Sequence, residues 1–290
     1  DRYYLLHNNS SYAVNNIAPV VSAVAVNAGS DITLTENTTT SVTLAATVTD
    51  NNSCQDISAV ESSLYRSGVG YAACDTNGED NDNNCYAVIT CAVGGGNTCD
   101  DATDASASYT CSVSVQYHAD PTDSATIYPT ETWKDSVKAT DNNSATHTVE
   151  VTTGVEVLSL IAYDVSSSIA YGTLSVGQSN DPLDKTTTVT ATGNVGLDQE
   201  LSGLNMTSGG NNIAVANQKY ALAVSTAYAS GTSLGGTPTE VELNVLKTTS
   251  SGSAQTKNTW WGLLIPNGTV AGTYSGTNTI VAVKGEIGNW

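Results

Sequence analysis

Oxygen-bearing side chains are most concentrated in one short segment, residues 74–85, which reads CDTNGEDNDNNC. Carboxylate and amide oxygens are the ligands that Ca²⁺ prefers in proteins. The segment is not an EF-hand loop, because Asp80 stands at the sixth position, where that loop needs Gly, and Tyr86 stands at the twelfth, where it needs Glu. A calcium site and a solvated acidic loop therefore both stay open. The candidate ligands are Asp75, Asn77, Glu79, Asp80 and Asp82, with a second acidic group further on at Asp100, Asp101 and Asp104.

The cysteines predict disulfide bonds and an extracellular location. All six, Cys54, Cys74, Cys85, Cys91, Cys99 and Cys111, lie in one stretch of the chain. An even number confined to a loop-rich segment is typical of disulfides formed in an oxidising compartment. A zinc site is the alternative, but no Cys-x-x-Cys pair occurs and the nearest histidine is His118. We predict Cys74–Cys85 and Cys91–Cys99 as local bridges and Cys54–Cys111 as the long one.

Little in the sequence points to catalysis. The three histidines, His7, His118 and His147, are scattered, and no Gly-x-Ser-x-Gly motif presents a serine nucleophile. Phosphate-binding and dinucleotide-binding loops are also missing. Acidic residues are abundant, so counting alone leaves open the carboxylate pair of a glycosidase. We expect that the protein is not an enzyme, with an extracellular hydrolase as the third-ranked alternative.

The charge of the chain excludes several classes of partner. Among 290 residues, 28 are acidic and 9 are basic, which gives a net charge of −19. Nucleic-acid binding needs a basic surface, and anionic lipid also repels such a protein. Residues 1–157 carry 20 acidic and 4 basic side chains (−16), whereas residues 158–290 carry 8 and 5 (−3). No apolar stretch is long enough for a membrane span.

Alternating apolar and polar residues predict an all-β fold with two antiparallel β-sandwich domains. In residues 40–49, Val42, Leu44, Ala46 and Val48 alternate with Thr and Ala, which is typical of a half-buried strand. Seven or eight such segments predict an immunoglobulin-like, disulfide-rich domain over residues 18–157. A second sandwich is predicted over residues 158–290, and its expected strands include residues 169–176. Residues 1–17 precede both as an extension.

Several segments resemble known surface proteins. Residues 19–54 (PVVSAVAVNAGSDITLTENTTTSVTLAATVTDNNSC) are similar to immunoglobulin-like modules of bacterial and archaeal secreted surface proteins. Residues 185–194 (KTTTVTATGN) and 260–283 (WWGLLIPNGTVAGTYSGTNTIVAV) resemble the sandwich domains of TasA-like and WxL-type envelope proteins. The resemblance implies an extracellular matrix or fibre component whose subunits can join by donating a terminal strand. It brings no catalytic motif.

The ends of the chain carry the residues predicted to contact another subunit. Tyr3, Tyr4, Leu5 and Leu6 form an apolar segment that could add a strand to the open sheet edge of another copy, and Trp290 could act similarly from the other end. The alternatives are a strand that docks on its own sheet and a disordered terminus. Strand donation predicts a homopolymer, namely an extracellular filament or surface layer.

The second-ranked function is a cell-surface adhesin or carbohydrate-binding module. In that case exposed tryptophans would stack on the sugar rings of cell-surface glycans, with Trp133, Trp260 and Trp261 as the candidates. Tryptophans buried in a sandwich core are the competing interpretation.

Overall fold

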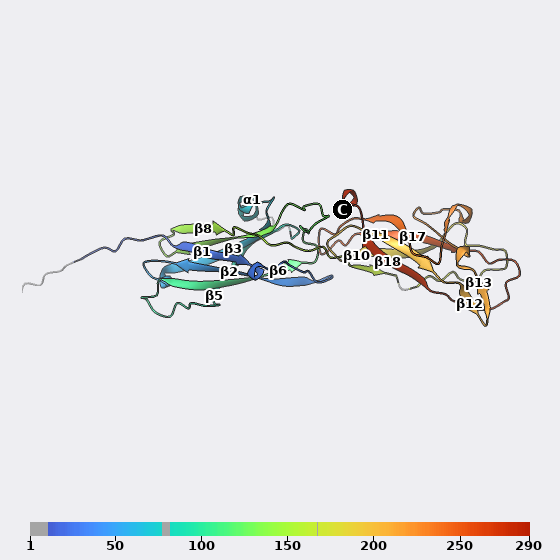
Figure 1. The fold of residues 1–290 in the computed structure, drawn as a ribbon, viewed down its shortest axis with the longest axis horizontal. Helices are drawn as coiled ribbons and strands as arrows, with labels where there is room; N and C mark the ends of the chain where they lie inside the picture. Colours follow the sequence, from blue (N-terminus) through green and yellow to red (C-terminus); the bar gives the residue numbers. More distant parts are fainter. Residues whose placement is uncertain (1–10, 77–81, 167) are drawn as a thin grey trace, which may run out of the picture.

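Two β-sandwiches arranged end to end make up the chain in this computed structural model, which describes residues 11–76, 82–166 and 168–290 (Figure 1). Residues 11–19 run away from the outer end of the N-terminal sandwich. The C-terminal residue lies beside the junction of the two sandwiches, and the far end of the molecule carries a small hairpin. The prediction of an all-β, antiparallel fold is therefore confirmed.

The N-terminal sandwich has two four-stranded antiparallel sheets. One sheet has the order β1-β2-β6-β5, and the other has the order β4-β3-β7-β8. Labelled A to G along the chain, these are the A-B-E-D and C′-C-F-G sheets of the immunoglobulin arrangement. The strands are β1 (Val20–Val26), β2 (Thr39–Thr49), β3 (Ile57–Arg66), β4 (Cys85–Thr90), β5 (Ala92–Val93), β6 (Ser106–Gln116), β7 (Trp133–Asp141) and β8 (Thr146–Glu150).

The alternation read in the sequence produces the core of this sandwich. Val42, Leu44, Ala46 and Val48 of β2 are all buried, as predicted. Trp133 is fully buried between the sheets, and its Nε1 donates a hydrogen bond to the carbonyl oxygen of Asp120 at 2.9 Å. The turn at residues 141–143 joins β7 and β8, where Asp141 Oδ1 accepts from the backbone N–H groups of Asn143 and Ala145.

Three disulfides occur in the N-terminal sandwich, but only one of the predicted pairings is right. Cys74 pairs with Cys85, as expected, whereas Cys54 pairs with Cys99 and Cys91 with Cys111. The loop before β6 returns to the start of β3, where Cys54 N–H donates to the Asp104 carbonyl at 2.7 Å, and this contact brings Cys99 to Cys54. Cys111 lies opposite Leu44 in the β2–β6 ladder, where it is buried and meets Cys91.

The C-terminal sandwich has a five-stranded sheet, β15-β14-β17-β10-β9, and a three-stranded sheet, β16-β11-β18. Separate hairpin strands β12 and β13 lie at the far end. The strands are β9 (Tyr163–Val165), β10 (Lys185–Ala191), β11 (Leu197–Gly203), β12 (Met206–Ser208), β13 (Asn211–Ile213), β14 (Gln218–Ala221), β15 (Thr232–Ser233), β16 (Thr239–Val245), β17 (Thr256–Leu263) and β18 (Asn278–Lys284).

Helical structure in the described residues is confined to short segments. The one α-helix in the described part of the chain is α1 (Tyr71–Thr76). The 3₁₀ turns are η1 (Asn27–Gly29), η2 (Cys54–Asp56), η3 (Val215–Asn217), η4 (Tyr228–Ser230) and η5 (Ile287–Asn289). Among the described residues, no helix is both long and apolar enough to cross a membrane.

The second sandwich repeats the strand plan of the first but stops one strand earlier. In the first sandwich, β3 pairs with β7, and β8 then pairs with the outer edge of β7. In the second, β11 pairs with β18 in the same way, but among the described residues no strand follows on the outer edge of β18. The position equivalent to β8 is therefore unfilled.

Candidate functional site

The unfilled strand position beside β18 faces backbone groups that do not bond to β11. Leu204 N–H donates to the Thr277 carbonyl and Gly285 N–H donates to the Gly196 carbonyl, both at 2.9 Å. Because backbone direction alternates along an antiparallel pair, the odd-numbered residues of β18 bond to β11. The backbone groups of Asn278, Ile280 and Ala282 consequently face outward.

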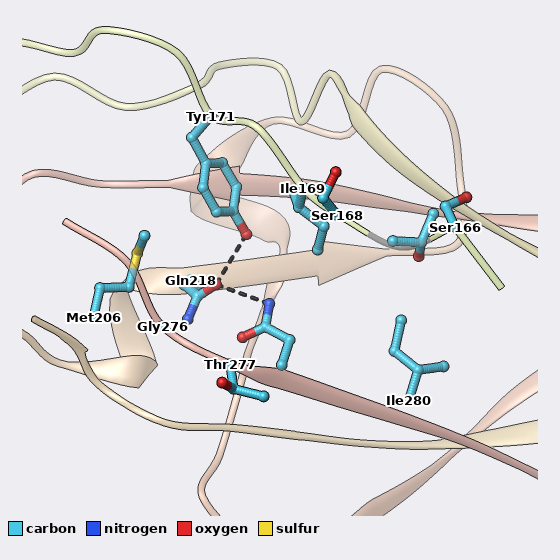
Figure 2. A pocket seen from close by; sticks show the side chains of 11 residues that line it. Ser166, Ser168, Ile169, Tyr171, Met206, Gln218, Gly276, Thr277 and Ile280 are labelled. Carbon is cyan, nitrogen blue, oxygen red and sulfur yellow. Dashed lines mark hydrogen bonds between the residues drawn. The ribbon is translucent and has the colours of Figure 1, made fainter. Parts of the chain in front are cut away.

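A cavity of about 320 Å³ lies along this edge (Figure 2). One wall is formed by Gly276, Thr277, Asn278 and Ile280, and the other by Ser166, Ser168, Ile169 and Tyr171. Thr187 and Gln218 also line the cavity. The Ile280 carbonyl accepts a hydrogen bond from Tyr163 Oη at 3.1 Å. The site is therefore a partly filled slot between the two sheets.

Gln218 holds the two walls of this cavity together. Its Oε1 accepts hydrogen bonds from Tyr171 Oη at 3.1 Å and from Asn278 Nδ2 at 2.9 Å (Figure 2). Burial raises the pKa of Tyr171, so its hydroxyl stays a neutral donor. Gln218 Nε2 is buried and has no hydrogen-bond partner in the described part of the chain. An incoming carbonyl oxygen would satisfy this donor.

The hollow continues towards the far end of the sandwich. Two further cavities, of about 420 and 410 Å³, share the apolar residues Leu174, Ile213, Ile265 and Tyr274. The first of these also shares Ile169, Tyr171 and Met206 with the cavity beside β18. The three cavities thus form one discontinuous channel along residues 168–176, with mixed polar and apolar walls beside β18 and mainly apolar walls in the last cavity.

Residues 169–176 were expected to form a strand, and this expectation is wrong. The residue pattern of the segment is typical of a strand, but the segment belongs to no sheet. Gly172 has φ +80°, which interrupts a β conformation. Tyr171 is nevertheless buried, and Ile169 and Leu174 pack against the core. The side chains cover the core here without a paired backbone.

Residues 11–17 are exposed, and hydrogen bonds near their C-terminal end attach them to the N-terminal sandwich. Tyr12 and Val14 are 90% and 74% exposed. Asn16 Nδ2 donates to Asp141 Oδ2, and the Ile17 N–H donates to Asn52 Oδ1, both at 2.7 Å. The predicted contact residues Tyr3, Tyr4, Leu5 and Leu6 lie outside the described residues. Their role as a donated strand stays a prediction.

Trp290 lies on its own sandwich. Its side chain packs against the core formed by β10, β11, β16 and β18. Its Nε1 donates to the Gly285 carbonyl at 2.9 Å, and the Lys284 Nζ lies 5.1 Å from its ring centroid. Trp290 therefore packs within its own subunit. Its predicted contact with a second copy stays a prediction.

The predicted calcium loop is described only in part. Asn77, Glu79 and Asp80 lie outside the described residues, and so does the side chain of Asp75. Asp82 lies in the turn before β4, where its carbonyl accepts from Tyr86 Oη at 2.7 Å. Calcium binding by this loop stays a prediction.

In the second acidic group, Asp100, Asp101 and Asp104, the side chains of Asp101 and Asp104 accept hydrogen bonds from nearby backbone N–H groups. Asp104 Oδ2 accepts from the N–H groups of Asp100 and Asp101 at 3.2 and 3.0 Å. Hydrogen bonds from Thr103 lower the pKa of Asp101. These carboxylates stabilise a turn.

The structure brings together two carboxylate groups that the sequence did not indicate. In each group the ligand oxygens lie within 4.8 Å of one another. Repulsion by Glu286 and Asp198 raises the pKa of Glu242. Each group joins segments that are remote in the sequence, so spacing along the chain holds no signal of them. They are Asp50, Asp56 and Asp141, and Asp198, Glu242 and Glu286.

Two of the three tryptophans predicted as candidates for sugar stacking are buried and cannot contact a glycan. Trp133 and Trp261 have no exposed surface, and Trp261 Nε1 donates to Thr187 Oγ1 at 2.9 Å. Only Trp260 is partly exposed.

The two histidines in the described part of the chain pack within the N-terminal sandwich or at its junction with the second. His147 Nδ1 accepts from the Val21 N–H at 3.0 Å, which ties β8 to β1. His118 is fully buried, and His7 lies outside the described residues.

Comparisons with known proteins add no family. No protein-family model matches the sequence, and no curated protein matches it. The chain is similar to a solved chain from the chaperone–tip adhesin complex of CFA/I fimbriae biogenesis, with 7% identity, 90% of this chain and 80% of that chain covered, and a TM-score of 0.31. It is also similar to dimeric latent PorU from Porphyromonas gingivalis, with 13% identity, 94% and 21% of the two chains covered, and a TM-score of 0.25. At these TM-scores neither likeness carries an argument about function. The three disulfides by themselves indicate an oxidising, extracytoplasmic compartment.

Proposed function

We propose that this protein is a structural subunit of an extracellular filament, in which residues 1–17 of one copy add a strand beside β18 of the next copy. The supporting observation is that, among the described residues, the C-terminal sandwich has an unfilled strand position, while residues 11–17 extend exposed from the opposite end of the molecule. In this proposal the protein is a component of the cell surface and not an enzyme.

The lengths are compatible. Seventeen extended residues reach at most about 55–60 Å, whereas the seven residues of β18 need about 23 Å of partner strand. About ten residues are then left to cross between subunits.

The side-chain pattern also fits. Residues on one face of a strand are two positions apart, so either Tyr3 and Leu5 or Tyr4 and Leu6 would enter the channel together. Backbone hydrogen bonds to Asn278, Ile280 and Ala282 would supply affinity in any register, and the fit of alternate side chains into the cavities would select one register. Gln218 Nε2 would gain an acceptor.

This contact joins the tail of one copy to the far sandwich of another, so it is heterologous. Contacts of this kind generate rings or open-ended filaments. The elongated shape, with donor and acceptor towards opposite ends, favours a filament (Figure 1).

Electron microscopy of the purified protein tests the proposal. We expect ordered fibres from the full chain and monodisperse particles after deletion of residues 1–15. Leu5→Asp/Leu6→Asp should also abolish fibres, because a charge buried between the sheets without a partner is costly. Asn8→Asp/Asn9→Asp adds the same charge outside the apolar segment and serves as the matched control. Fibres from the deleted chain would contradict strand donation.

A second variant tests the acceptor. Ala282→Pro removes an N–H that points away from β11, so the intramolecular ladder is kept while one intersubunit bond is lost. We expect this variant to stay folded by circular dichroism but to form few or no fibres. Ala282→Gly keeps the N–H and should still polymerise. If both variants polymerise equally well, β18 is not the acceptor.

A further inference from the structure

Five buried polar side chains meet where the two sandwiches touch. Lys247 follows β16 in the C-terminal sandwich, and the other four belong to the N-terminal sandwich. Each is at most 8% exposed. The five are Arg66, Asn83, His118, Asp120 and Lys247.

Asp120 connects the two cations of this cluster. Its Oδ1 lies 3.0 Å from Lys247 Nζ, and its Oδ2 lies 3.1 Å from Arg66 Nε. Arg66 also contacts Glu131 through Nη1. Burial lowers the pKa of Lys247, and Asp120 opposes this effect. Transfer of one proton from Lys247 to Asp120 would convert a buried ion pair into two neutral groups, which a low-dielectric site favours.

The side-chain amide of Asn83 faces the same amine. Lys247 Nζ lies 3.1 Å from Asn83 Oδ1, and His118 Nδ1 also lies 3.1 Å from this oxygen. Asn83 Nδ2 donates to the Thr249 carbonyl at 2.8 Å, which assigns the orientation of the amide.

His118 is a neutral donor towards Asn83. Burial, with the charge of Lys247 as the second cause, lowers the pKa of His118 to about 4. An uncharged ring that faces a carbonyl oxygen through Nδ1 must carry its proton on Nδ1. The carbonyl of Asn83 is therefore polarised by donors, as a carbonyl is in an oxyanion hole.

We propose that Lys247 and Asn83 are a self-processing site, which joins them in an amide cross-link between the two sandwiches. Asp120 takes a proton from the Lys247 ammonium, and the neutral Nζ attacks Cγ of Asn83. A new Nζ–Cγ bond forms, the Cγ–Nδ2 bond breaks, and Nδ2 leaves as ammonia with the proton held by Asp120, so that the net product is one ammonium ion. No oxidant, reductant or cofactor takes part.

The carboxylate carbon of Asp120 also lies near Lys247, but it is a poorer electrophile than Cγ of Asn83. Asp120 is the counter-ion of both Lys247 and Arg66, and an ionised carboxylate resists attack by an amine. The amide of Asn83 is uncharged and already bonded to two donors at its oxygen. The nucleophile Nζ lies within hydrogen-bond distance of both the base Asp120 and the amide of Asn83, as general-base catalysis requires.

The cross-link would change how the molecule carries tension. A covalent bond between residues 83 and 247 would carry force past residues 84–246. These residues include the connection between the sandwiches at residues 151–162. A pulling force along the chain would then be transmitted across the junction without unfolding the strands between. This consequence does not depend on how the subunits assemble.

Intact-mass spectrometry of the wild-type protein decides the proposal without a variant. After allowance for three disulfides, we expect essentially every folded molecule to be lighter than its sequence by one ammonia. Tandem spectra of the reduced, digested protein should show one branched peptide that contains residues 83 and 247. A mass with no such loss would overturn the proposal. Loss of one water with a branch at Asp120 would overturn the assignment of Asn83.

Variants separate chemistry from packing. Lys247→Arg keeps the charge beside Asp120 but removes the nucleophile, so it should restore the full mass. Asp120→Asn should do the same by removing the base. Lys257→Arg, a lysine in β17 far from this amide in the strand order, is the matched control and should keep the loss. A folded Lys247→Arg protein that still lost ammonia would refute the chemistry.

Discussion

At the scale of single residues, Asp135 is a carboxyl group buried inside the N-terminal sandwich. It lies on β7 with no exposed surface, and its Oδ1 accepts from Ser62 Oγ at 2.5 Å. Its Oδ2 has no hydrogen-bond partner among the described residues. Burial raises the pKa of Asp135 to about 7. The carboxyl group is therefore protonated in the folded protein under mildly acidic conditions.

This shift predicts that stability falls as the pH rises. In the unfolded chain Asp135 loses its proton near pH 4, whereas the folded protein keeps it until about pH 7. The folded state binds more protons between these values, so the free energy of unfolding decreases through that window by about 4 kcal/mol. Urea denaturation at pH 4, 6 and 8 should show the decrease.

Asp135→Asn should remove this pH dependence. The variant is expected to match the wild type near pH 4 and to exceed it at pH 8, because the amide never ionises. Asp164→Asn, at an exposed position of β9, controls for the change in net charge and should leave the slope unaltered. Parallel pH profiles for wild type and Asp135→Asn would show that Asp135 titrates normally.

At the scale of elements, β18 differs from its counterpart β7. Strand β7 is paired on both sides, by β3 and β8, whereas β18 is paired on one side by β11. Ser166 and residues 168–171 lie near its open edge, but these residues do not pair with it. The edge is short and recessed, which limits non-specific strand pairing.

Hydrogen exchange should read this edge residue by residue. In protein lacking residues 1–15, the amides of Thr279 and Val281 should be protected by β11, while those of Ile280 and Ala282 should exchange fast. A synthetic peptide of residues 1–17 should slow exchange at Ile280 and Ala282 by at least about tenfold, because each gains a carbonyl acceptor. The peptide with Leu5→Asp/Leu6→Asp should have no effect. Equal protection of all four amides before peptide addition would contradict an open edge.

At the scale of the whole molecule, donor and acceptor are separate, so one can be removed without the other. A copy that lacks residues 1–15 can still accept a tail but cannot donate one. Such a copy would end the filament it joins. The acidic N-terminal half (−16) and the nearly balanced C-terminal half (−3) also favour contact between unlike halves over contact between two N-terminal sandwiches.

We therefore expect the tail-deleted protein to shorten filaments when it is mixed with the full chain before assembly. One deleted copy per ten full-length copies should reduce the mean fibre length to roughly ten subunits, if each deleted copy ends one filament. Length distributions from electron micrographs measure this effect. The deleted protein that also carries Ala282→Pro can neither donate nor accept and should leave the length unchanged. Unchanged lengths with the simple deletion would argue against head-to-tail strand donation.

The sequence by itself determined the features that depend on near neighbours. The period-two pattern of Val42, Leu44, Ala46 and Val48 requires a half-buried strand wherever it packs, and the structure confirms it. The turn at residues 141–143 and the Cys74–Cys85 bridge are likewise local, since the bridge spans only 11 positions.

Tertiary structure decided the features that join remote segments. Cys99 meets Cys54, and Lys247 meets Asn83, because of where whole strands and sandwiches lie, and neither pair has a signal in its spacing. The sequence pattern of residues 169–176 also predicted a strand, yet pairing needs a neighbouring edge and a backbone that Gly172 interrupts. The open edge of β18 became visible only when the strand orders of the two sandwiches were compared, because an unfilled position is a property of the sheet and of no single segment.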